Sequence, residues 1–144
     1  AKALELYYND KGYYPIDDGD GHIVLAYDSG GSTAYQTLDW GDKFADPTQS
    51  LTIYMATLPQ DPNGETRYFY QAMHRSFDSG SQTNSYDPHD ATTDDYAEAY
   101  RLYGVLENAN DSQVVEGGIS GTDCGTNEAI LCNFYITSGN VDIN

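Results

Sequence analysis

The sequence is poor in basic residues and has no long hydrophobic run. Only 6 of its 144 residues are Lys or Arg, against 23 Asp and Glu, so the formal net charge is −17. A chain this acidic is repelled by phosphate backbones and by anionic lipid, which disfavours nucleic-acid partners and binding to membrane surfaces. No segment approaches the ~20 consecutive apolar residues that span a bilayer.

Aliphatic side chains are also scarce. Leu, Ile, Val and Phe together make up 25 of the 144 residues. Such a low content with a high net charge is typical of disordered chains. The 14 tyrosines and one tryptophan reverse that interpretation, because each aromatic ring can bury roughly 150–250 Å². We therefore expect a folded domain with an aromatic-rich core.

The two cysteines, Cys124 and Cys132, are close together in the sequence. No CxxC or Cys/His pattern typical of a metal site surrounds them. In a Tyr-, Gly- and Asp-rich acidic chain, the pair favours one disulfide formed in an oxidising compartment. Two free buried thiols are the alternative.

Residues 1–11 are predicted to form a helix, because Ala, Lys, Leu and Glu are strong helix formers. Its polar stripe is narrow, and the rest of its surface is apolar. We expect that apolar surface to serve subunit packing, through Ala3, Leu4, Leu6, Tyr7 and Tyr8. Gly12 stands where a left-handed C-terminal cap belongs.

Further elements follow from local signals. Asp46-Pro47 predicts the start of a second helix that ends before Pro59. The stretch from His22 to Tyr27 suits a short strand or a buried loop. Strands are predicted over 66–74, 96–106 and 129–137, where apolar and polar residues alternate or β-formers gather. Residues 76–95 are predicted to form a long polar loop.

Three phrases, in this order, resemble one known family. They are the helix end Ala3–Pro15, the phrase Leu58-Pro59-Gln60-Asp61-Pro62-Asn63-Gly64, and the strand Tyr100–Asn108. They resemble the head domains of type IV pilins and of the pseudopilins of type II secretion. Major pseudopilins usually carry a Trp where this chain has Asn63, so the resemblance favours a pilus over a secretion system.

The resemblance implies an α+β fold, with the N-terminal helix packed on a three- or four-stranded antiparallel sheet and long loops between. Residues 1–11 would be the lower half of the assembly helix, and residues 12–144 the globular head. An upstream apolar half would anchor the preprotein in the inner membrane, so that the chain lacking it would be a monomer. The expected partners are other pilin subunits and the assembly machinery, and the expected location is a filament at the cell surface. A disulfide near the C-terminus, like Cys124–Cys132, occurs in many pilins.

No cofactor is required by this interpretation, but calcium is one hypothesis. Asp87, Asp90, Asp94 and Asp95 cluster in the predicted long loop, and Ca²⁺ takes six to eight oxygen ligands. Pseudopilins that resemble this chain bind calcium in a late loop. The alternative is a solvated acidic loop. A second cluster, Asp17, Asp18 and Asp20, lacks the spacing of an EF-hand.

Two other classes of function are alternatives to a filament subunit. Catalysis has little support, because His22, His74 and His89 lie far apart and no nucleophile motif is near them. We therefore expect a structural protein and not an enzyme. A carbohydrate-binding or adhesive module is the main competitor, since exposed Tyr with Asp and Asn suits sugar stacking. Its candidates are Tyr13, Tyr14, Tyr86 and Tyr96; the alternative is that these rings are core residues.

Overall fold

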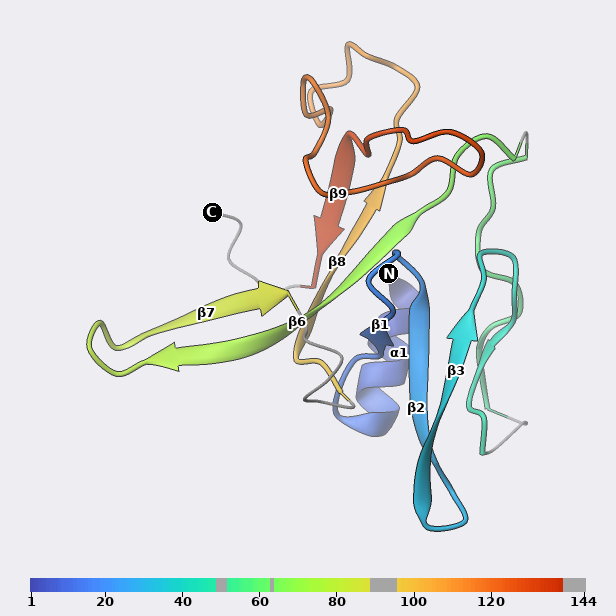
Figure 1. Ribbon diagram of the computed structural model, residues 1–144, viewed down its shortest axis with the longest axis vertical. Helices are drawn as coiled ribbons and strands as arrows, with labels where there is room; N and C mark the ends of the chain where they lie inside the picture. The colour runs from blue at the N-terminus through green and yellow to red at the C-terminus, as the bar shows by residue number, and fades with distance from the viewer. Residues whose placement is uncertain (49–51, 63, 89–95, 139–144) are drawn as a thin grey trace.

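The computed structural model describes residues 1–48, 52–62, 64–88 and 96–138. Within these ranges the chain forms one helix and nine strands (Figure 1). The elements are α1 (Lys2–Lys11), β1 (Ile16–Asp17), β2 (Ile23–Ser29), β3 (Ser32–Leu38), β4 (Phe44–Ala45), β5 (Ile53–Met55), β6 (Phe69–Asp78), β7 (Thr83–Pro88), β8 (Ala99–Gly104) and β9 (Phe134–Thr137). In the described residues, no helix is long and apolar enough to cross a membrane.

The predicted α+β class is wrong, because the fold is mostly β. Its strands form three small antiparallel sheets, ordered β1-β2-β3, β4-β5 and β7-β6-β8-β9. The helix contributes only ten residues. The prediction failed because the region between Ile16 and Met55 was expected to hold a turn, a short strand or buried loop from His22 to Tyr27, and a second helix, whereas it holds two of the three sheets.

Helix α1 ends as predicted. Gly12 adopts the left-handed conformation, with φ 85° and ψ 5°, and its backbone N–H donates to the carbonyl of Tyr8. A residue with a Cβ would be strained at this φ, so the glycine stops the helix at Lys11. The cap directs the chain back toward the sheet, where Tyr14 exchanges both backbone hydrogen bonds with Ala97.

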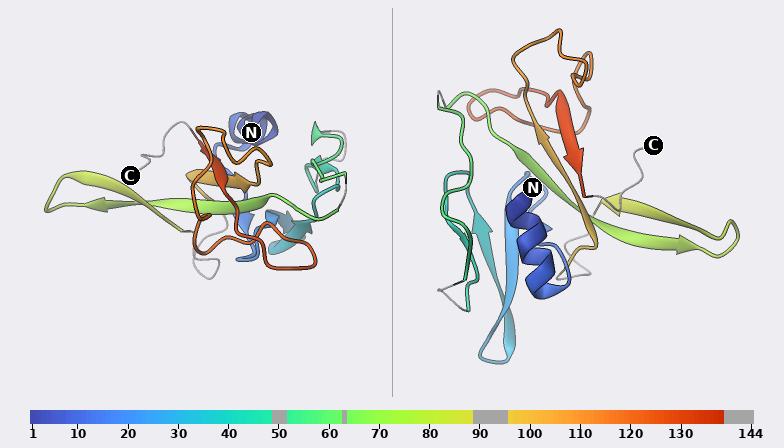
Figure 2. Two further views of the ribbon diagram at one scale, coloured as in Figure 1. Left: turned by 90° about the horizontal axis from the view of Figure 1, so that it is seen from above. Right: turned by 180° about the vertical axis from the view of Figure 1, so that it is seen from behind.

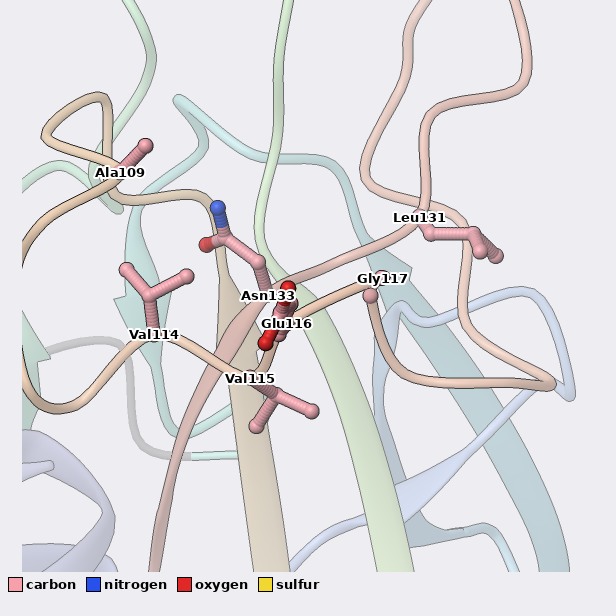
Figure 3. Close-up of a pocket in the computed structure, with 8 residues that line it drawn as sticks. Ala109, Val114, Val115, Glu116, Gly117, Leu131 and Asn133 are labelled. Carbon is pink, nitrogen blue, oxygen red and sulfur yellow. The ribbon is translucent and has the colours of Figure 1, made fainter.

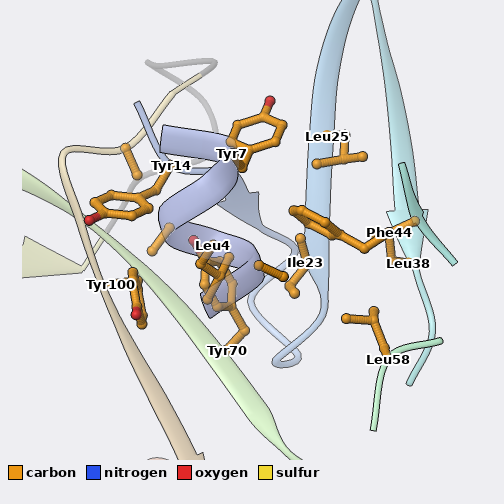
Figure 4. Packing of buried hydrophobic residues seen from close by; sticks show 13 residues of the cluster. Leu4, Tyr7, Tyr14, Ile23, Leu25, Leu38, Phe44, Leu58, Tyr70 and Tyr100 are labelled. Carbon is orange, nitrogen blue, oxygen red and sulfur yellow. The ribbon is translucent and has the colours of Figure 1, made fainter. Parts of the chain in front are cut away.

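Different parts of the chain pack on the two faces of the four-stranded sheet. On one face Tyr70, Ala72 and Tyr100 pack with α1, β2 and β3 in the main core, and their exposed fractions are at most 1%. Figure 4 shows α1 between β2 and the strands that carry Tyr70 and Tyr100. On the opposite face Phe69 and Tyr103, which are paired across β6 and β8, pack with the cystine of Cys124 and Cys132. Because side chains alternate along a strand, neighbouring residues of β6 pack on opposite faces of the sheet.

The predicted second helix after Asp46 is absent from the described part of the chain. The Asp46 carboxylate does accept hydrogen bonds from the backbone and side chain of Thr48, as a helix cap would. However, the Asp46 N–H donates to the carbonyl of Thr52, so the chain turns back and pairs β4 with β5. The β-branched and aromatic side chains of Ile53 and Tyr54 favour this strand over a helix.

The predicted polar loop over 76–95 is also wrong in its first part. Strand β6 continues to Asp78, a tight turn follows, and β7 returns antiparallel with His74 opposite Asp87. This β6–β7 hairpin projects from the body of the domain, as does the turn end of the β2–β3 hairpin (Figures 1 and 2). Polar side chains hid the hairpin from the sequence pattern, because a strand pair that extends beyond the core needs no apolar face.

Candidate functional site

Helix α1 divides the predicted packing residues into two groups. Ala3, Leu4 and Tyr7 are buried in the domain's own core, with exposed fractions of 6%, 4% and 2%. Leu6 and Tyr8 point outward and remain 45% and 38% exposed. The helix therefore has one side that stabilises the domain. Leu6 and Tyr8 are two positions and about 200° apart around the helix, so they are exposed on opposite edges of that buried side. We call Leu6 and Tyr8 the outward pair.

At the C-terminal end of α1, other aromatic rings lie beside the exposed ring of Tyr8. The ring of Tyr8 lies against that of Tyr14, with centroids 4.6 Å apart. The ring of Tyr13 lies 5.7 Å from that of Tyr96, which is 49% exposed. Tyr8 and Tyr96 are therefore held in place by buried or half-buried neighbours. A surface with pre-ordered rings loses little side-chain entropy when it binds a partner.

The hydroxyls of two tyrosines fix the flank of α1. Tyr14 and Tyr100 donate to the two carboxylate oxygens of Glu5, at 2.9 Å and 3.2 Å. Burial raises the pKa of both hydroxyls above the ordinary value, and the nearby Glu5 charge raises it further. The Glu5 carboxylate therefore has its hydrogen-bond partners within the domain.

Two contacts tie the end of α1 to the β4-β5 sheet. The Lys11 ammonium donates to the Asp46 carboxylate at 2.5 Å, and the Tyr54 hydroxyl donates to Asp10 at 2.5 Å. Burial raises the pKa of Asp46, but the hydrogen bonds from Lys11 and Thr48 outweigh it and hold the pKa at about 2. These contacts join segments 35 and 44 residues apart, so α1 is held as a rigid part of the domain.

The predicted disulfide is confirmed, with Cys124 and Cys132 bonded and both fully buried. The Asp123 carboxylate accepts from the backbone N–H groups of Gly125 and Ile130, and these bonds lower the pKa of Asp123. Gly125 leaves no room for a side chain, since a Cβ there would lie 1.7 Å from the carbonyl oxygen of Glu128. The loop from Cys124 to Cys132 is here named the disulfide loop. Its backbone conformation is fixed by the disulfide, by the hydrogen bonds to Asp123 and by the close contact at Gly125.

A wide, open hollow of about 560 Å³ lies beside the disulfide loop (Figure 3). Its apolar lining includes Val114, Val115 and Leu131, of which Leu131 is 50% exposed. The Asn133 side chain, which also lines it, exchanges two hydrogen bonds with the backbone of Leu106. The amide of Asn133 therefore braces the loop and is not available to orient a bound molecule.

Most of the predicted calcium ligands lie outside the described residues. Asp90, Asp94 and Asp95 lie outside the described residues. Asp87 lies in β7 by its backbone, and its side chain is likewise outside the description. Within the described part of the chain, no group of three or more His, Cys, Asp or Glu side chains is placed to hold a metal ion.

The second acidic cluster has separate structural tasks. Asp17 is buried and accepts from the backbone N–H of Ala72 at 2.7 Å. Asp18 accepts from the backbone N–H groups of Asp20 and His22 and contacts His22 Nδ1 at 2.6 Å. These carboxylates are used to shape the turn before β2.

Of the predicted sugar-stacking tyrosines, Tyr13 and Tyr96 are brought into contact, with ring centroids 5.7 Å apart. Tyr14 is only 4% exposed and belongs to the core, whereas Tyr96 is exposed beside the half-buried Tyr13. The side chain of Tyr86 is outside the description. Sequence reasoning also missed the contact of Trp40 with Tyr68 and the ion pair of Lys11 with Asp46. No local pattern signals either pair, since their members are far apart in the chain.

Comparison of the chain with protein-family models, curated protein sequences and solved structures gives no match. Any function proposed for it therefore rests on its own residues and on the resemblance of three sequence phrases.

Proposed function

We propose that this domain is the head of a structural subunit in a pilin-like surface filament, which assembles through α1. The observation that carries the proposal is the division of α1. Ala3, Leu4 and Tyr7 secure the helix in its own domain, while the outward pair, Leu6 and Tyr8, is exposed on the two edges of that buried side. A subunit that packs helix against helix needs both properties at once.

Two further features support the proposal. The ties from Lys11 and Asp10 to β4-β5 hold α1 firmly, so that force on the helix is transmitted to the head. The net charge of −17 keeps assembled filaments apart in solution through mutual repulsion. The partners in this proposal are other copies of the subunit and the assembly machinery. A pseudopilus in the periplasm is the alternative location for the same assembly.

The Leu6→Glu substitution tests the role of the outward pair. In cells that produce the full-length protein, we expect the yield of sheared surface filaments to fall about tenfold or more, because a charge would enter an apolar contact. The free energy of unfolding should change by no more than about 0.5 kcal/mol, since Leu6 is exposed. Filament yield is measured by immunoblot of the sheared fraction, and stability by urea unfolding of the isolated domain.

Gln36→Glu serves as the matched control, because it adds the same charge at an exposed position on β3. Its filament yield should equal that of the parent protein. A Leu6→Glu variant that forms filaments normally would overturn the proposal. Recovery of the chain in periplasmic and not in extracellular filaments would select the pseudopilus.

A further inference from the structure

Two hollows meet between the segment that leads into β6 and the segment that follows β3. One, of about 190 Å³, is lined by Trp40, and the other, of about 230 Å³, by Tyr68. They share four lining residues, Gln60, Asp61, Thr66 and Arg67. The two hollows therefore adjoin along these residues and are here named together the Trp40 cleft; each is smaller than the ~300–1,000 Å³ typical of ligand sites.

An aromatic pair forms the apolar wall of the cleft. The rings of Trp40 and Tyr68 have centroids 5.4 Å apart and planes inclined by 53°. Both side chains are half-buried, so each ring is anchored and still reaches the cleft. The indole Nε1 of Trp40 is shielded and has no hydrogen-bond partner among the described residues. A bound molecule would therefore contact the carbon surface of the ring and not its N–H.

The polar wall of the cleft is pre-formed. Asp61 accepts from the backbone and hydroxyl of Thr66, which fixes the turn between them. Gln60 Nε2 donates to the Trp40 carbonyl at 2.7 Å. Gly41, with φ 104°, permits this contact, because a Cβ there would lie 2.4 Å from the Gln60 side chain. The hydroxyl of Thr126 in the disulfide loop donates to the carbonyl of Gly64 and so supports the same turn.

The cleft is lined by both basic and acidic side chains, which can donate and accept hydrogen bonds. Arg67 is one of six Lys and Arg residues in the chain, and its guanidinium lies 5.9 Å from the centre of the Phe69 ring. Glu107 lines the part of the cleft beside Tyr68, and His22 lines the part beside Trp40. His22 is held by Asp18 at 2.6 Å. Mixed polar groups beside two rings match a ligand with apolar faces and hydroxyls at its edges.

We propose that the Trp40 cleft binds an uncharged carbohydrate, with pyranose rings against Trp40 and Tyr68 and hydroxyls bonded to the side chains of the polar wall. Nucleotides and acidic sugars are disfavoured, because the chain carries a net charge of −17. The inference is independent of filament assembly, since the cleft residues are distinct from the outward pair on α1.

Tryptophan fluorescence provides a direct test, because Trp40 is the chain's single tryptophan. The probes are neutral hexasaccharides of glucose, mannose, galactose or N-acetylglucosamine, titrated to millimolar concentration. We expect at least one to change the Trp40 emission saturably. Its dissociation constant should rise about tenfold in Tyr68→Leu and in Arg67→Met, because stacking and hydrogen bonding are each lost.

Tyr35→Leu is the control, because Tyr35 is 55% exposed on β3 and lines neither part of the cleft. Its affinity should equal that of the parent, and thermal melting should show that all three variants are folded. The proposal is overturned if no neutral hexasaccharide changes the emission, or if only a polygalacturonate hexamer does. It is also overturned if folded Tyr68→Leu and Arg67→Met bind as the parent does.

Discussion

Replacing Cys124 and Cys132 together by alanine is expected to lower the free energy of unfolding by about 2–3 kcal/mol. The bond closes a short loop, for which the chain-entropy model gives a contribution of this size. Both sulfurs are fully buried against Phe69 and Tyr103, so part of the packing on that face of the sheet is lost as well. The change would be measured by urea unfolding of the oxidised parent and the double variant.

The parent protein treated with a reducing agent provides the control, since it breaks the bond without changing the sequence. It should lose stability by a similar amount. Because α1 and the main core lie on the opposite face of the sheet, the far-ultraviolet signal of the helix should persist in the double variant below its unfolding midpoint. Equal stability of parent and double variant would show that the loop is held by its hydrogen bonds alone.

The Asp46→Asn substitution is expected to cost about 2 kcal/mol. Asp46 is nearly inaccessible, with 2% of its side chain exposed, and it is the partner of Lys11. Replacing it leaves the ammonium without its charged partner, although Lys11 is 26% exposed and water reduces the penalty. The measurement is chemical unfolding at neutral pH, with Glu116→Gln as an exposed control that should change stability little.

The same residue predicts how stability depends on pH. The pKa of Asp46 is lowered from 3.8 to about 2 in the folded state. A lowered pKa contributes stability that is complete above pH 3.8 and is lost as the pH falls toward 2. Parent and Asp46→Asn should therefore differ most at neutral pH and converge in acid. Parallel pH profiles of the two proteins would contradict the assigned role of the ion pair.

The sequence predicts those parts of the fold that depend on nearby residues. Gly12 could be recognised as a helix cap because the left-handed conformation there demands glycine. Strands β8 and β9 fall within predicted strand segments, and β6 begins within one and continues beyond it to Asp78. The alternation of side chains between the two covered faces made β6 and β8 recognisable. The disulfide was recognised from two cysteines in a chain whose composition suits an oxidising compartment.

The parts that failed depend on contacts between distant residues. The Asp46-Pro47 signal is the same for a helix start and for a turn, and the backbone pairing with Thr52 decides between them. Strands β1, β4 and β5 were missed because each has only two or three residues. Strand β3 was missed because most of its side chains are exposed, and β2 was predicted only as one of two alternatives for the stretch from His22 to Tyr27. Since those strands outweigh one ten-residue helix, the fold class was mistaken as well.

The sequence likewise predicts only part of the two candidate binding surfaces, the outward pair on α1 and the Trp40 cleft. The apolar character of α1 identified Leu6 and Tyr8, but sequence could not show that Ala3, Leu4 and Tyr7 face inward. The direction of that burial depends on where Tyr70 and Phe44 lie in the folded core. The Trp40 cleft could not be foreseen, because Trp40 and Tyr68 meet only after β6 is placed beside the turn at Gln60.

The two projecting hairpins, β2 with β3 and β6 with β7, also affect how the domain moves through water. They extend from the body in different directions, so the molecule has a larger hydrodynamic radius than a sphere of equal mass (Figures 1 and 2). A compact chain of 144 residues has a radius of gyration of ~15 Å. Small-angle X-ray scattering should give a larger value, together with an asymmetric distribution of interatomic distances that tails toward long separations.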